Sequence, residues 1–183
     1  FSLVTMNRNL TSGGGPTLTI ASGTTVPLGS SPSLTLSNAS GGYYYLTNNG
    51  TITSTTTGTL TLNVYGVLTN AGTITANSAT QLTMNGSITN NGTLSLNAAA
   101  TIDLNSNGGY GAGSFTNGAS GVLTTAANPT FTVSGDFVVP SGSTFPSNAT
   151  LTLDGVWTGN TSLNAPGATF ALVTINRNIA SVS

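Results

Sequence analysis

The chain contains no cysteine, histidine, lysine or glutamate, and only 3% of its 183 residues are charged. The missing residue types exclude disulfides, serine–histidine triads, zinc sites built on cysteine and histidine, and lysine bases. The two cations, Arg8 and Arg177, stand near opposite ends of the chain, which is too little positive charge for a nucleic-acid interface. We therefore expect no nucleic-acid partner, no metal and no cofactor.

Long apolar runs are also missing, because no stretch approaches the roughly 20 apolar residues of a membrane-spanning helix. We expect no membrane span. The net charge of −1 gives copies of the chain almost no electrostatic repulsion. Since residue 1 is Phe rather than Met, we also expect a processed or trimmed chain, in which a removed secretory signal would leave no trace.

What the chain does contain is a repeat of about 20 residues. Four apolar residues from Leu46 to Leu62 are separated by steps of 6, 8 and 2 residues, and the next two repeats keep these steps. A parallel β-helix returns the same inward position on every coil, so the spacing predicts an all-β, single-stranded parallel β-helix (β-solenoid) of about seven to eight coils. The pattern consists of Leu46, Ile52, Leu60 and Leu62, then Leu68, Ile74, Leu82 and Met84, then Ile88, Leu94, Ile102 and Leu104.

The apolar pattern continues on both sides of these repeats, which predicts one β-solenoid domain over residues 1–183. Leu18 and Ile20 are 2 residues apart, like Leu60 and Leu62 at the end of a central repeat, so we expect them to close a coil. Val139 should open a later coil and correspond there to Leu46. We expect the last inward position of every coil to form one column. This column consists of Leu36, Leu62, Met84, Leu104, Val133, Leu153 and Leu172.

Polar residues recur in register with the apolar ones. Stacked coils should place like residues above like, so that asparagine amides hydrogen-bond along the stack and glycine at corners adopts left-handed backbone conformations. We interpret these columns as structural rather than as ligand sites. The three columns are Asn48, Asn70 and Asn90; Gly50, Gly72 and Gly92; and Asn63, Asn85 and Asn105.

The two ends of the chain are near-duplicates. Residues 1–12 read FSLVTMNRNLTS and residues 170–181 read FALVTINRNIAS. Neither end carries a capping element, so we expect uncapped ends that meet head-to-tail between copies, with a contact that does not close on itself. The expected subunit interface consists of Phe1, Leu3, Val4, Met6, Arg8, Leu10, Phe170, Leu172, Val173, Ile175, Arg177 and Ile179.

Two other interpretations of the duplication stay open. The similar segments could be an ordinary pair of internal coils in a capped solenoid. Alternatively, the chain could be one 169-residue repeat of a longer surface protein.

Seven asparagines precede a non-proline residue that is followed by Ser or Thr, which is the acceptor pattern for N-glycosylation. Attached glycans would explain how a surface with so little charge stays hydrated. The possible sites are Asn9, Asn38, Asn49, Asn85, Asn91, Asn148 and Asn160.

The carboxylates offer one enzymatic possibility, because glycoside cleavage needs only two of them. The chain has three, and we expect Asp103 and Asp154 roughly two coils apart with no cation nearby. We therefore expect no enzymatic activity.

Threonine and serine should face outward on three consecutive coils, as Thr51 and Thr53, Thr73 and Thr75, and Thr93 and Ser95. Such an array resembles the ice-binding face of β-solenoid antifreeze proteins. Outward threonine is also what β-propensity alone favours.

The segments LTNNGTI (46–52), LTNAGTI (68–74) and ITNNGTL (88–94) resemble the repeats of filamentous-haemagglutinin-like adhesins and other extracellular β-solenoids. The composition also resembles that of archaeal extracellular filament subunits joined by strand donation. The resemblance implies an extracellular, cell-surface protein. We expect a structural filament subunit that assembles with itself; the alternatives are a stalk or glycan-binding segment of an adhesin, and an ice-binding protein.

Overall fold

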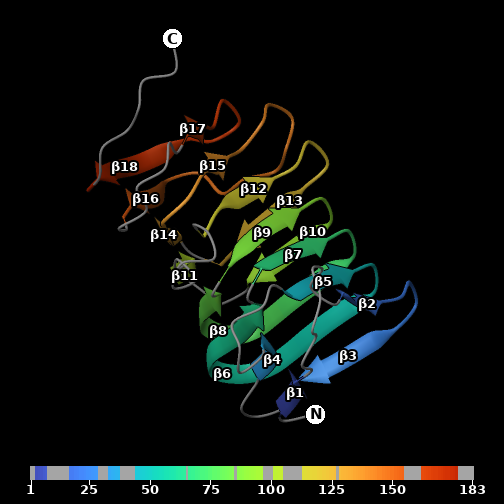
Figure 1. The fold of residues 1–183 in the computed structure, drawn as a ribbon. Coiled ribbons are helices and arrows are strands. Elements are labelled where there is room, and N and C mark those ends of the chain that lie inside the picture. Colours follow the sequence, from blue (N-terminus) through green and yellow to red (C-terminus); the bar gives the residue numbers. More distant parts are fainter. Residues whose placement is uncertain are drawn as a thin grey trace.

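The protein is described by a computed structural model that covers residues 3–7, 17–28, 33–37, 44–64, 66–84, 86–96, 101–104, 113–126, 128–154 and 162–176. These residues form strands and turns, and every strand pairing among them is parallel. Figure 1 shows the strands stacked from β1, beside the N-terminus, to β18 at the opposite end. None of the described residues forms a helix long and apolar enough to span a membrane.

The strands form three rows along the stack. The first row is a seven-stranded sheet in the order β17-β15-β12-β9-β7-β5-β2. Its strands are β2 (Thr17–Ile20), β5 (Tyr44–Asn48), β7 (Gly66–Asn70), β9 (Ser87–Asn90), β12 (Phe115–Asn117), β15 (Phe137–Val138) and β17 (Leu163–Asn164).

The second and third rows belong to one 11-stranded sheet, because two long strands, β6 (Thr51–Val64) and β8 (Thr73–Met84), run through both rows. The second row also contains β3 (Thr25–Leu28), β10 (Thr93–Leu96) and β13 (Val122–Thr125). The third row also contains β1 (Leu3–Asn7), β4 (Ser33–Ser37), β11 (Thr101–Leu104), β14 (Thr130–Val133), β16 (Ala149–Leu153) and β18 (Phe170–Ile175).

The chain visits the rows in a fixed order, which confirms the predicted parallel β-solenoid. From β9 in the first row it passes through β10 in the second row to β11 in the third, and the next coil repeats the path through β12, β13 and β14. The third row follows the path β1-β4-β6-β8-β11-β14-β16-β18, whose eight strands agree with the predicted number of coils.

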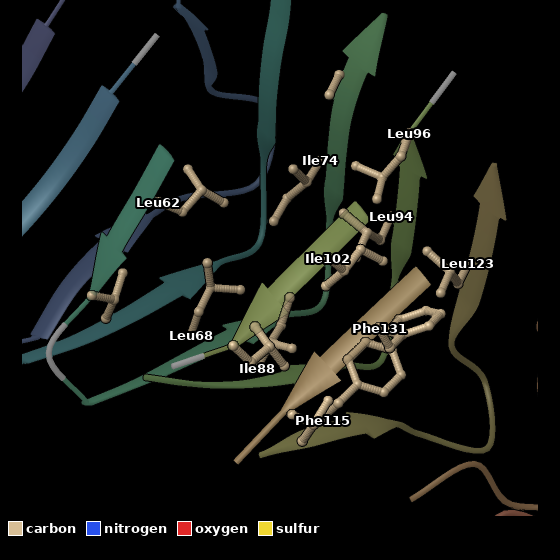
Figure 2. Packing of buried hydrophobic residues seen from close by; sticks show 14 of the residues in the cluster. Leu62, Leu68, Ile74, Ile88, Leu94, Leu96, Ile102, Phe115, Leu123 and Phe131 are labelled. Atoms are coloured by element: carbon tan, nitrogen blue, oxygen red, sulfur yellow. The ribbon is translucent and has the colours of Figure 1, made fainter. Parts of the chain in front are cut away.

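The core lies between the rows and is filled by alternate residues of the central strands. Strand β7 alternates buried and partly exposed residues along its length, as do β9, β10 and β11. In the second row Ile52, Ile74 and Leu94 stack on consecutive coils and are fully buried. Figure 2 shows Ile74 and Leu94 of this row together with inward side chains of the other rows, such as Leu68 and Ile102. Burial of each such side chain contributes about 1.5–3 kcal/mol.

The later coils replace aliphatic residues by phenylalanine. Phe115 and Phe137 stack in the first row with ring centroids 5.2 Å apart, and Phe131 of the third row lies 5.3 Å from Phe115. Phe145 stacks on Phe131 at 5.4 Å. These rings fill the core of the later coils, in which the spacing of the apolar residues changes.

The expected columns hold in the central coils and are wrong at both ends. Leu18 pairs with Leu46 and therefore belongs to the first row, not to the third. Leu36 pairs with Val64 instead of Leu62.

The later coils contain two further errors of the same kind. The residue that corresponds to Leu46 in the later coil is Phe137 and not Val139. The column that contains Leu46 runs through Phe115 to Phe137. Leu172 pairs with Thr150 and lies on the outer face. The errors at Leu36 and Val139 are shifts of two residues, and the error at Leu172 is a shift of three, because Ile175 takes the position expected for it. Turn lengths differ between coils, and the apolar alternation alone does not count turn residues.

Candidate assembly surfaces

The two near-duplicate segments provide the first and the last strand of the third row. Among the described residues, β1 pairs only with β4 and β18 pairs only with β16. Each strand therefore has one edge without a strand partner in this part of the chain. Unpaired strand edges offer main-chain donors and acceptors to a further strand.

Corresponding residues of the two strands lie at register positions that differ by an even number of residues. Val4 pairs with Leu34 in β4, and its counterpart Val173 pairs with the buried Leu151 in β16. When the paired residues are followed from coil to coil, Val4 falls in the same column as Ile175. In the alignment of the two duplicated segments, however, the residue that corresponds to Ile175 is Met6. The two ends are thus offset by two residues, and an even offset keeps inward residues inward.

Strand β18 exposes apolar side chains. Leu172 is 57% exposed, Val173 37% and Ile175 47%, although Val173 and Ile175 stack on the buried Leu151 and Leu153. The last coil therefore leaves its inward face open to solvent. Leu163 at the end of the first row is also exposed.

The structure describes four of the other predicted interface residues. Phe170 packs against the core, 5.7 Å from the ring of Phe137 and 6.0 Å from that of Phe145. Leu3, Val4 and Met6 lie in β1. The five remaining predictions, Phe1, Arg8, Leu10, Arg177 and Ile179, fall outside the described residues.

The first asparagine column is a buried hydrogen-bonded ladder. The Nδ2 atom of Asn48 donates to Oδ1 of Asn70 at 2.7 Å, and Asn70 donates in turn to Asn90 at 2.8 Å. Asn90 continues to Asn117, also at 2.8 Å, so the ladder has a fourth member that the sequence pattern did not indicate. Each Nδ2 atom also donates to a main-chain carbonyl of the next coil or corner.

Apolar residues stand at both ends of this ladder. At the first end, Ile20 of the preceding coil pairs with Asn48. At the other end, Thr116 pairs with Val138, so the next residue, the buried Val139, stands in the position after Asn117 that a fifth asparagine would take. In the part of the chain that the structure describes, Oδ1 of Asn48 has no hydrogen-bond partner. The ladder is a structural element inside the core and is not open to a ligand.

The glycine column is confirmed, but for a different physical reason. Gly50, Gly72 and Gly92 do not have the left-handed backbone expected of corners; among the described glycines only Gly23 and Gly142 have positive φ. A Cβ atom on Gly72 would lie 2.1 Å from the carbonyl oxygen of Gly50. Glycine is therefore needed because consecutive corners approach too closely for a side chain.

The third predicted column cannot be followed in the structure. Asn85 and Asn105 lie outside the described residues, and only the backbone of Asn63 is placed, in β6.

Three of the seven glycosylation candidates lie among the described residues, and all three are exposed. Asn49 and Asn91 stand at the same corner, two coils apart, each followed by a glycine of the close-packed column. Asn148 has a left-handed backbone with φ of 61°. The other four candidates, Asn9, Asn38, Asn85 and Asn160, fall outside the described residues.

The predicted threonine pairs do stand on consecutive coils of the second row. The other rows carry comparable columns: Thr101, Thr130 and Thr150 follow one another in the third row. The first row has a longer column, made of Thr19, Thr47, Thr69, Thr89 and Thr116. Outward threonine is therefore a general feature of the coils and singles out no ice-binding face.

The acidic residues are distributed along the stack. Asp103 shares a column with Thr152 two coils later, and Asp154 follows that coil, as expected. Asp136 accepts hydrogen bonds at Oδ1 from the main-chain N–H and the hydroxyl of Ser162, at 2.6 and 3.1 Å. Among the described residues there is no group of three or more histidine, cysteine, aspartate or glutamate residues that could hold a metal.

Comparison of the chain with protein-family models, curated proteins and solved structures found no match.

Proposed function

We propose that the protein is a structural subunit of an extracellular filament, which assembles head-to-tail through its two ends by coil stacking or strand complementation. The observation that carries the proposal is the relationship between β1 and β18. They are near-identical in sequence, belong to the same row and stand at opposite ends of it. All strands in the row run parallel, so the end of one copy has the right polarity to continue into the start of the next.

The physical forces that favour such a contact are main-chain hydrogen bonding and apolar burial. A strand edge gives affinity through its main chain, and the inward side chains on alternate positions give register. The exposed Val173 and Ile175 would be covered by the neighbouring copy. Because the contact joins two different surfaces and does not close on itself, it generates an open filament.

Composition supports the same proposal. A net charge of −1 does not oppose close packing of many copies. The exposed glycosylation candidates Asn49, Asn91 and Asn148 lie outside β1 and β18, so glycans there are compatible with stacking through these strands. We infer an extracellular, cell-surface location from these candidates together with the resemblance of the repeats.

Electron microscopy of the purified full chain tests the proposal. We expect fibres from the unmodified protein and none from Ile175→Asp, because a carboxylate at the open end of the core would be buried between copies. Ala71→Asp is the matched control: this residue is exposed at a corner in the middle of the solenoid, and its substitution should leave the fibres intact.

An unmodified protein that stays monomeric at high concentration would contradict the filament and favour a stalk segment of an adhesin. Equal fibre formation by Ile175→Asp and the unmodified chain would show that the contact lies elsewhere.

A further inference from the structure

The numbers of strands in the rows differ by one. Among the described residues, the first row has seven strands, from β2 to β17, and the third row has eight, from β1 to β18. Figure 1 shows β1 and β18 at the two extremes of the stack. A continuous solenoid needs one strand from each row on every coil, so simple stacking of β18 on β1 of the next copy would leave one strand in excess.

The excess disappears if β18 and the next copy's β1 occupy the same place in the third row. Each copy then adds seven strands to the first row of the filament and seven to the third row. The first row would join without a gap, because Leu18 and Leu163 stand at the two ends of one column that runs through every strand of that row. Leu163, which is 38% exposed, would then be covered by β2 of the next copy.

The two strands are chemically interchangeable. The residues of β1 read LVTMN, and residues 172–176 read LVTIN, so that only Met6 and Ile175 differ. β1 pairs with β4 through five consecutive residues from Leu3 to Asn7. A strand with the sequence of β18 can make the same main-chain pairs with β4 and keep its valine facing inward.

We infer that β1 is replaced by β18 of a neighbouring copy when the filament forms. In a free copy it occupies the edge of β4, and in the filament β18 of the neighbouring copy replaces it on that edge. This inference rests on the proposed function and specifies how the copies join. The exchange conserves the main-chain pairs on β4, while coverage of Val173, Ile175 and Leu163 is gained. Growth of the filament then requires release of β1, which keeps free copies from assembling at once.

A reversible disulfide between β1 and β4, which we call the lock, tests the inference in the full chain. Thr5 pairs with Thr35, so Thr5→Cys and Thr35→Cys together place two cysteines on adjacent strands of a chain that has no others. Adjacent strands lie about 4.8 Å apart, within the range that a disulfide spans. The matched control combines Thr152→Cys and Thr174→Cys, which joins β16 to β18 and leaves both ends of the contact free.

We expect the oxidised lock variant to form no fibres and to recover fibre formation when the disulfide is reduced, while the control forms fibres in both states. Fibres from the oxidised lock variant would overturn strand replacement and leave the filament standing. Absence of fibres from the unmodified chain and from both reduced variants would overturn the filament itself. Failure of the lock cysteines to form a disulfide, measured by intact mass, would contradict the β1–β4 pairing on which the inference depends.

The axial repeat gives an independent measurement. Strand replacement predicts seven coils per subunit and an axial repeat of about 34 Å, whereas stacking of all eight strands predicts about 38 Å. Diffraction from aligned fibres or from their images separates the two values, and a repeat of about 38 Å would overturn strand replacement.

Discussion

The side-chain amide of Asn48 donates a 2.7 Å hydrogen bond to Oδ1 of Asn70, which lies 22 residues later and one coil further along the solenoid. Both side chains are fully buried. Burial of an amide is unfavourable unless its polar atoms form hydrogen bonds. If a coil shifted along its row, these bonds would be lost and the amides would lie beside apolar side chains. The ladder therefore fixes the register of the central coils, which the apolar columns alone leave open to shifts of two residues.

Replacement of Asn70 by alanine should destabilise the solenoid more than replacement of an exposed asparagine. Asn70→Ala removes the acceptor for Asn48 and the donor for Asn90 at once. We expect the free energy of unfolding to fall by about 1–3 kcal/mol. Asn49→Ala, at the exposed neighbouring corner, is the control and should change it by less than about 0.5 kcal/mol. Urea denaturation followed by circular dichroism measures both, and equal effects would contradict a stabilising ladder.

The close approach of corners predicts a large effect at Gly72. A Cβ atom there would collide with the backbone of Gly50, which cannot move without opening the stack. We expect Gly72→Ala to lower the free energy of unfolding by about 3 kcal/mol. Gly142 has open space but a φ of 91°, so Gly142→Ala should cost about 1–2 kcal/mol through backbone strain alone. A smaller loss at Gly72 than at Gly142 would contradict the steric explanation.

The sequence predicts the central coils well because three repeats there keep the same steps between apolar residues. The prediction fails at Leu18 and Leu36, where the spacing between paired residues departs from that of the central repeats. Leu172 was misplaced because the alternation in the last coil changes phase, with an irregular register between Ala149 and Thr150. Alternation identifies a strand and its faces, but the length of each turn decides which row the strand joins.

The same limit applies to the asparagine ladder. Asn117 is followed directly by Gly118, whereas glycine comes two residues after the ladder asparagine in the earlier repeats. In addition, 27 residues separate Asn117 from Asn90 instead of the 20 between Asn70 and Asn90. Three-dimensional pairing was needed to place it. The duplicated ends were evident from the sequence, whereas the difference of one strand between the rows required the topology.

The aromatic part of the core predicts unequal effects of phenylalanine substitutions. Phe131 is fully buried and contacts the rings of Phe115, Phe137 and Phe145. We expect Phe131→Ala to lower the free energy of unfolding by about 3–5 kcal/mol, because the cavity cannot collapse between stacked coils. Phe145 is only partly buried, and Phe145→Ala should cost about half as much. Thermal or urea denaturation ranks the two, and the reverse order would place the centre of the core elsewhere.

The exposed corners predict where glycans attach. In a host that glycosylates secreted proteins, Asn49 and Asn91 should be modified, because both are exposed and each precedes a glycine and a threonine. Thr51→Ala should abolish modification of Asn49 without touching Asn49 itself, and Thr51→Ser should retain it. Mass spectrometry of glycopeptides measures the occupancy at each site. Modification confined to sites other than Asn49, Asn91 and Asn148 would contradict accessibility as the factor that selects them, since these three are the exposed candidates among the described residues.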